Sequence, residues 1–343
     1  MSSRLPIKSH KYTAAKPKKE DSMAGLNELK RTVKGLVIPI PAVFDGKGEP
    51  DLPMIEKLTD WYLDCGVHGF FILGSQGQGP ACRIDQRKAV AETVVRRINK
   101  RVPAIVQVGA VDPYTSIELG LHAKQIGADA IGVVGPYYYS DRNEWELIEH
   151  YKMVDNAVGL PMLLYNNPEY SGYPITPATM AKLREAVPNI FAAKLAMGNI
   201  DQAVNYLRVL SREFVLFIPV TQMLPGMLIG VKGSIAAGTP VTVPESGVQL
   251  IEAIWAGEYE RAQKIQVLLL EHGERMAPIR AYGRRITLEG LRLRGLEVKE
   301  YPRWPTKPLT PEHQKIYEQN MKRILDELSA LTGRSAARER KAV

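Results

Sequence analysis

A lysine, Lys194, interrupts an apolar stretch of the chain (residues 191–197, Phe-Ala-Ala-Lys-Leu-Ala-Met). Such a run predicts a buried strand, and removal of a lysine from water disfavours its charged ammonium form. Two interpretations fit this pattern. In the first, Lys194 lies near the strand end and extends its amine to water. In the second, the amine is kept neutral and attacks a carbonyl carbon to form a Schiff base.

Residues with acid–base or anion-binding capacity follow three other apolar segments. They are the loop at 74–79 (Gly-Ser-Gln-Gly-Gln-Gly), the tyrosines at 137–139 and the sequence Tyr165-Asn166-Asn167. Hydroxyls and backbone amides of such a loop suit a carboxylate. A phenol can relay the protons that formation and collapse of a carbinolamine require. A structural interpretation stays open for each: the tyrosines can pack as core or rim aromatics, and the asparagines can be turn residues.

The elements that must position these residues alternate between apolar segments and segments of helical periodicity. Strands are predicted at 35–42, 69–73, 103–108, 129–134, 161–165, 191–197, 214–219 and 233–237. Helices are predicted between them at 51–65, 83–100, 113–126, 144–158, 176–186, 201–210 and 224–231. Eight strands at a spacing of about 25–35 residues predict an α/β fold, a closed (β/α)8 TIM barrel. A doubly wound sheet would have fewer strands, and the loop at 74–79 has neither G-x-G-x-x-G nor P-loop spacing.

Barrel active sites form at the carboxyl ends of the strands. The fold therefore brings Ser75, Gln76, the tyrosines and Lys194 to one mouth, provided that Lys194 points inward. The barrel is predicted to span residues 31–240, followed by a helical extension packed on it at 241–331. Flexible basic tails are expected at 1–30 and 332–343, because chain ends rich in lysine and arginine are usually solvated.

Composition excludes several classes of protein. The 343 residues are 45% hydrophobic and 24% charged, as in a globular chain, and much of the net charge of +8 lies in the two tails. The sequence has no basic stretch with interleaved aromatics, so no nucleic-acid partner is predicted. No apolar run reaches the roughly twenty residues that cross a bilayer, so no membrane partner is predicted either. The two cysteines and the lack of an apolar leader favour a reducing, cytoplasmic location. The histidines are scattered, and no metal site is predicted.

Taken in order, these residues resemble the dihydrodipicolinate synthase and N-acetylneuraminate lyase family of pyruvate-type class I aldolases, over roughly residues 35–308. Each motif is weak alone, but their order is specific. The similar segments are 74–78 (family G-[ST]-[ST]-G-E), 136–138 (P-Y-Y), 165–168 (Y-N-x-P), 193–194 (the family lysine) and 230–235 (G-A-x-G-x-I-S).

The resemblance implies a role for each matching residue. Lys194 would form the imine with pyruvate or another 2-keto acid, and Tyr165 would be the general acid and base. Tyr138 would reach the edge of the site from the same or a neighbouring subunit. The remaining candidates would bind substrate: Gly74, Ser75, Gln76, Asn167 and the carbonyl of Ile235. It also implies no cofactor beyond the covalent lysine imine, a 2-keto acid and an aldehyde as ligands, and a homo-oligomer, either tetramer or dimer.

Several positions depart from the family pattern. Gln76 replaces the second hydroxyl, Gln78 the loop glutamate and Leu195 the acidic residue that usually follows the lysine. Residues 169–171 (Glu-Tyr-Ser) replace the segment that carries an arginine in dihydrodipicolinate synthases, which argues against a role in lysine biosynthesis. The leading hypothesis is therefore a class I Schiff-base lyase or aldolase, acting on a carbon–carbon or carbon–oxygen bond, with another partner substrate. A hydratase-aldolase or keto-acid dehydratase would use the same intermediate. The alternative is an altered barrel that binds a keto acid in a regulatory role. A phosphosugar barrel enzyme ranks last, because 238–240 (Gly-Thr-Pro) makes a poor phosphate loop.

Overall fold

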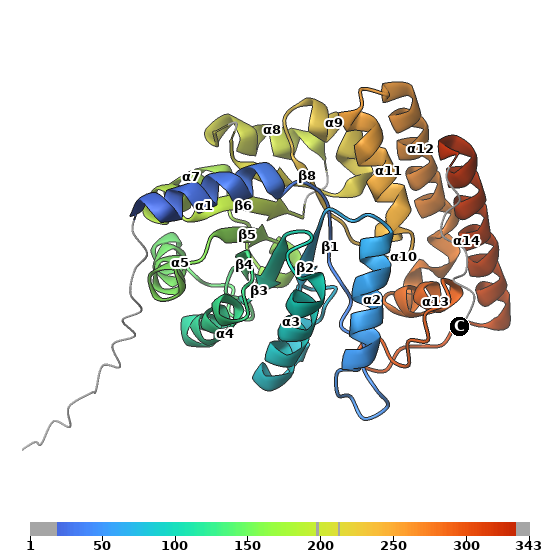
Figure 1. The fold of residues 1–343 in the computed structure, drawn as a ribbon, viewed down its shortest axis with the longest axis horizontal. Helices are drawn as coiled ribbons and strands as arrows, with labels where there is room; N and C mark the ends of the chain where they lie inside the picture. The colour runs from blue at the N-terminus through green and yellow to red at the C-terminus, as the bar shows by residue number, and fades with distance from the viewer. Residues whose placement is uncertain (1–18, 197–198, 212, 334–343) are drawn as a thin grey trace, which may run out of the picture.

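The eight predicted strands close into a parallel barrel in the computed structural model, which describes residues 19–196, 199–211 and 213–333 (Figure 1). Each strand pairs with its neighbours in the sequence, and β8 pairs with β1 to close the ring. The strands are β1 (Gly35–Ile38), β2 (Gly69–Ile72), β3 (Ala104–Gln107), β4 (Ala130–Val134), β5 (Met162–Asn166), β6 (Ile190–Leu195), β7 (Val215–Phe217) and β8 (Gly233–Ile235). The predicted (β/α)8 barrel is confirmed.

Helices follow the strands in turn. The principal ones are α2 (Leu52–Asp64), α3 (Ile84–Ile98), α4 (Pro113–Gln125), α5 (Glu144–Val158), α7 (Pro177–Ala186), α8 (Ile200–Val209), α9 (Met223–Leu228) and α11 (Pro244–Trp255). Their starts follow ordinary capping chemistry. Asp112 accepts a hydrogen bond from the backbone N–H of Thr115, and Thr176 accepts one from that of Thr179. Both caps precede a proline in the first turn of the helix, where the missing N–H costs nothing.

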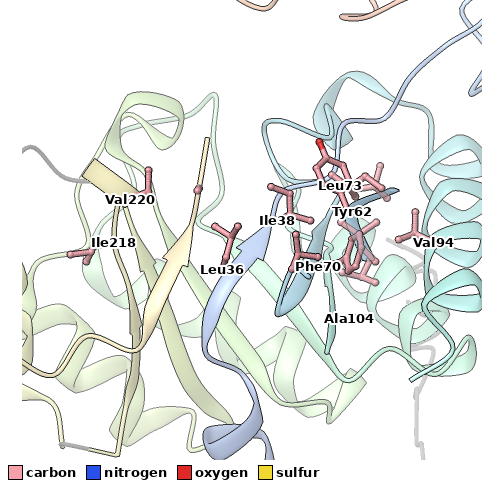
Figure 2. Packing of buried hydrophobic residues seen from close by; sticks show 14 of the residues in the cluster. Leu36, Ile38, Tyr62, Phe70, Leu73, Val94, Ala104, Ile218 and Val220 are labelled. Carbon is pink, nitrogen blue, oxygen red and sulfur yellow. The ribbon is translucent and has the colours of Figure 1, made fainter. Parts of the chain in front are cut away.

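Strand side chains point alternately into two separate cores. Leu36, Ile38 and Phe70 point outward and join the large cluster between the barrel and its helices (Figure 2). There the ring of Tyr62 from α2 meets Phe70 edge-on, with 6.3 Å between ring centroids. The intervening strand residues fill the barrel interior: Val37, Phe71, Ile105, Ala130, Val134, Leu163, Tyr165, Phe191, Ala192, Val215, Phe217 and Ile235. The interior is thus a packed core that leaves chemistry to the strand ends.

The predicted N-terminal tail contains a helix, α1 (Lys19–Thr32). Its residues Leu26 and Leu29, three apart on one face, pack against the barrel interior beside Val33. This burial accounts for the helix where a solvated tail was expected at 1–30. Residues 1–18 and 334–343 lie outside the described residues, and so does most of the tail predicted at 332–343.

The C-terminal helices lie side by side next to the barrel (Figure 1). They are α11, α12 (Tyr259–Arg275), α13 (Arg285–Leu293) and α14 (Pro311–Thr332). Gly247 of α11 fits against Leu36 of β1, with only 3.1 Å between an added Cβ and the leucine side chain. The ring of helices around the barrel therefore continues past residue 240.

Several short elements were not predicted, because a single turn carries no periodic signal. They are α6 (Pro168–Ser171), α10 (Thr239–Thr242) and the 3-10 turns η1 (Gly79–Ala81), η2 (Val220–Gln222) and η3 (Ala277–Tyr282). In the part of the chain that the structure describes, no helix combines the length and apolarity that crossing a membrane requires.

Candidate active site

Lys194 points into the mouth of the barrel. It is paired in register with Tyr165 across β5 and β6, and its Nζ lies 4.3 Å from the centre of the Tyr165 ring. The ring of Phe71, from β2, is 5.9 Å from the same nitrogen. The amine thus lies against two aromatic rings, one from β2 and one from β5. The inward orientation that the Schiff-base interpretation requires is present, and Lys194 is partly buried.

Tyr165 has the hydrogen bonds expected of a proton relay. Its side chain is buried, with 3% of the residue exposed, and its hydroxyl accepts a bond from Asn167 Nδ2 at 2.8 Å. The hydroxyl of Ser75 lies 3.3 Å from the same phenol oxygen. Burial raises the pKa of Tyr165, but the charge of Lys194 and the bonds from Ser75 and Asn167 outweigh burial, so the net shift is downward. A phenol with a lowered pKa exchanges protons more readily near neutral pH.

The loop after β2 brings Ser75 to Tyr165 because glycines let it turn sharply. A Cβ on Gly74 would lie 2.5 Å from the ring of Phe71, and one on Gly79 would lie 2.1 Å from the carbonyl oxygen of Leu73. Neither position has room for a side chain. Ser75 and Gln76 themselves are only partly buried, so a ligand can reach the loop at the barrel mouth. Their predicted role in carboxylate binding stays a prediction.

The side chain of Gln76 contacts residues that the sequence did not point to. Its Nε2 lies 3.3 Å from Thr287 Oγ1, and its Oε1 accepts a bond from Arg284 at 3.3 Å. The hydroxyl of Tyr301 donates to the Gln76 backbone carbonyl at 2.9 Å. Gln78, the second glutamine of the loop, is buried and also contacts the C-terminal segment, since Arg303 N donates to its Oε1 at 2.7 Å. The segment after α12 therefore supports the loop, and nothing in its local sequence indicates this.

The other predicted site residues take different positions. Tyr138 is 82% exposed, stacks edge-on against Tyr139 and has a positive φ of 76°, which is strained for a bulky residue. It does not join the Lys194 cluster within this chain, and its catalytic role stays a prediction. Tyr137 instead packs against the barrel interior. Ile235 fills the interior from β8.

The two asparagines at the end of β5, Asn166 in the strand and Asn167 directly after it, have separate contacts in the structure. Asn166 is buried and anchors the following loop, because its Nδ2 donates to Ile175 O and to Tyr206 OH, both at 2.9 Å. Its Oδ1 accepts from Ile175 N at 3.0 Å. Asn167 instead turns to Tyr165, while its own Oδ1 is buried without a protein partner. That unpaired acceptor is consistent with a role of Asn167 in substrate binding, and the role stays a prediction.

The arrangement has the groups that imine chemistry needs: an amine, an adjacent phenol and a hydroxyl in contact with it. Among the residues described, no group of three or more histidine, cysteine or acidic side chains is placed to hold a metal ion.

Comparison with known proteins assigns the family. The sequence profile of the dihydrodipicolinate synthetase family matches residues 32–324. The chain belongs to that family. The 4-hydroxy-tetrahydrodipicolinate synthase 2 of Halalkalibacterium halodurans is 33% identical over 228 residues, which are 66% of this chain and 77% of that protein. The putative 2-dehydro-3-deoxy-D-gluconate aldolase YagE of Escherichia coli is 30% identical over 241 residues, 69% of this chain and 79% of that protein.

Two solved structures share the fold over most of this chain. YagE of Escherichia coli, in complex with pyruvate, has a TM-score of 0.78 and 26% identity, and the match covers 85% of this chain and 98% of that chain. The sialic acid aldolase of Ruminococcus gnavus has a TM-score of 0.78 and 25% identity, covering 87% of this chain and 99% of that chain. The resemblance stated from the sequence is thus confirmed at the level of the family.

Proposed function

We propose that this chain is a class I lyase or aldolase that binds pyruvate or another 2-keto acid as an imine at Lys194. The observation that carries the proposal is the in-register pair of Lys194 and Tyr165 at the barrel mouth, with Ser75 bound to the same phenol. The pyruvate bound to YagE supports this choice of substrate class. Two names among the relatives, synthase and aldolase, leave the partner substrate open.

In the proposed reaction, the amine of Lys194 attacks the 2-oxo carbon and a C–N bond forms. The former carbonyl oxygen takes two protons and leaves as water, which gives the imine. Tyr165 supplies and recovers protons in this step, and Ser75 is positioned to pass them on. Loss of a proton from C3 then produces an enamine. Its carbon forms a C–C bond with an aldehyde, or the reverse sequence releases one, and water hydrolyses the imine. The protonated imine is the electron sink, so the reaction uses no cofactor.

Lysine biosynthesis is not the role we propose, although many relatives are named 4-hydroxy-tetrahydrodipicolinate synthase. Residues 169–171 lack the arginine that, in dihydrodipicolinate synthases, the resemblance associates with the carboxylate of the second substrate. Tyr170 stands there, 47% exposed. We further propose a homo-oligomer, tetramer or dimer, in which the exposed Tyr138 reaches a neighbouring site. The cytoplasmic location remains a prediction from the sequence.

Hydrogen exchange at the methyl group of pyruvate tests the proposal. In D2O, an enzyme that forms the imine and then the enamine replaces the methyl protons with deuterium, which proton NMR follows directly. We expect exchange with the native chain and none with Lys194→Ala. Imine formation without any exchange or aldol turnover would instead favour the regulatory keto-acid-binding barrel.

A further inference from the structure

Arg284 is a partly buried cation at the active-site loop that the proposed reaction does not use. It precedes α13, and its guanidinium donates to Tyr301 OH at 3.1 Å and to Gln76 Oε1 at 3.3 Å. The ring of Trp304 lies 5.6 Å from the guanidinium carbon. All three partners are neutral, and Gln76 is the neighbour of Ser75 in the loop that contacts Tyr165.

Arg284 lies at the carboxyl end of the barrel, against the loop that follows β2. Gln76 follows β2, whereas Tyr170, whose phenol also affects Arg284, follows β5. These strands are three places apart in a ring of eight, so Arg284 lies close to loops that leave the carboxyl end of the barrel at well-separated strands. Burial lowers the pKa of Arg284, but the phenols of Tyr301 and Tyr170 raise it by more. A guanidinium is charged at any ordinary pH.

Arg284 differs from the arginines next to it. Arg285 and Arg292 both pair with Glu289, at 2.6 and 3.3 Å, and Arg294 pairs with Glu245 at 2.5 Å. Within the described ranges, no carboxylate lies within 4 Å of Arg284. A partly buried guanidinium held only by neutral oxygens has capacity for a stronger, charge-assisted partner.

We propose that Arg284 binds a carboxylate at the far end of the substrate, and so selects 2-keto acids or aldehyde partners that carry a second anionic group. The inference rests on the proposed function, because it takes the reacting carbonyl to be at Lys194. In this account a substrate attached to Lys194 extends toward the loop that carries Gln76, and its distal carboxylate would replace the 3.3 Å bond from Arg284 to Gln76 Oε1 with an ion pair. Arg284 is a specificity-determining residue in this account and takes no part in bond formation.

The test compares two 2-keto acids of equal chain length, 2-oxoglutarate with a distal carboxylate and 2-oxopentanoate without one. Each is titrated against the full-length protein, the imine is reduced with borohydride, and half-saturation is measured from the intact mass. We expect the native chain to prefer 2-oxoglutarate. In Arg284→Met the ratio of the two half-saturation concentrations should fall by about ten- to hundredfold. Arg284→Lys should retain part of the preference. Half-saturation by pyruvate and by 2-oxopentanoate, which lack a distal carboxylate, should change by the same factor in each variant.

Two control variants separate selectivity from support of the loop. Arg280→Met removes a nearby exposed arginine that bonds Gly273 O and should leave the preference intact. Thr287→Val removes the other contact of the Gln76 side chain without altering charge. The inference would be overturned if Arg284→Met weakened the binding of both keto acids equally and Thr287→Val did the same, because Arg284 would then only support the loop. An unchanged preference in Arg284→Met would overturn it as well. If Arg284→Met does not fold, Arg284→Gln serves in its place. Absence of any pyruvate imine in the native chain would overturn the proposed function, and this inference with it.

Discussion

Replacement of Tyr165 by phenylalanine removes one oxygen atom from the centre of the proposed proton relay. The ring remains, and with it the edge-on contact with Phe71 at 5.9 Å between centroids. What is lost is the acceptor for Asn167 Nδ2 and the contact with the hydroxyl of Ser75. The variant therefore tests proton transfer with little change in packing.

The expected loss of rate is large and the expected loss of stability is small. Proton transfer by a positioned side chain contributes about 10²–10⁴-fold to rate, or about 3–5 kcal/mol of transition-state stabilisation. A buried Asn167 amide left without its acceptor costs about 1–3 kcal/mol of folding free energy. This is below the total stability of about 5–15 kcal/mol for a typical domain, so Tyr165→Phe should fold.

The assay is deuterium exchange into pyruvate, measured with a thermal melt of each protein. Tyr151→Phe is the matched control, because it removes another buried phenol, bonded to Val133 O at 3.2 Å in the outer core. Both variants should lose similar stability, and only Tyr165→Phe should lose exchange. The exchange rate of the native chain, plotted against pH, should also change slope (the bend) below pH 10, the ordinary pKa of tyrosine, because the pKa of Tyr165 is lowered. Equal exchange rates in Tyr165→Phe and the native chain, or a bend that survives the substitution, would refute the reasoning.

Three further predictions concern the loop, the barrel and acid stability. Ser75→Ala should weaken pyruvate binding and move the bend in the pH profile upward, since a bond that lowers the pKa of Tyr165 is lost; an unmoved bend contradicts this. Gly233→Ala should prevent barrel closure, because its Cβ would lie 2.1 Å from the Gly35 carbonyl oxygen. Gly273→Ala, in open space on α12, should instead raise the free energy of unfolding by about 0.5–1 kcal/mol. A soluble Gly233→Ala protein with native stability would argue against the closure. Burial lowers the pKa of His150 from 6.5 to about 4, so unfolding free energy should fall by up to about 3 kcal/mol between those pH values, and His150→Leu should flatten that slope in acid melts.

Most of the barrel could be predicted from the sequence because its strands are covered on both faces. Near-continuous apolar runs therefore mark them, and the helical segments between them keep a 3.6-residue period. The strand ends were predicted too long: the segment at 35–42 contains a strand only at Gly35–Ile38. Residues 39–42 are buried without pairing, and their apolar character does not distinguish them from the strand.

The orientation of Lys194 could not be derived from alternation. The pairing of β5 with β6 shifts by one residue after Met162, so Phe191 and Ala192 both face the barrel interior. Only beyond this irregularity does the alternation place Lys194 inside, opposite Tyr165. The ordered motifs located the residues, but the local strand geometry decided which way they point.

The contribution of the C-terminal segment was outside the reach of local patterns. Arg284 and Gln76 are 208 residues apart in the chain, and Tyr301 and Gln76 are 225 apart. No spacing rule connects such positions, and the segment at 301–305 shows only the prolines of a connector. The support arises only in the folded chain, where the helices after α11 lie beside the barrel.

The central claim is that Lys194 forms a covalent imine with a 2-keto acid, and borohydride reduction in the presence of pyruvate tests it most directly. Peptide mass spectrometry of the reduced protein then locates the added mass. The account predicts one pyruvate adduct per chain, on the peptide that contains Lys194, and none in Lys194→Ala. No adduct at saturating pyruvate, or an adduct confined to other lysines, would contradict it.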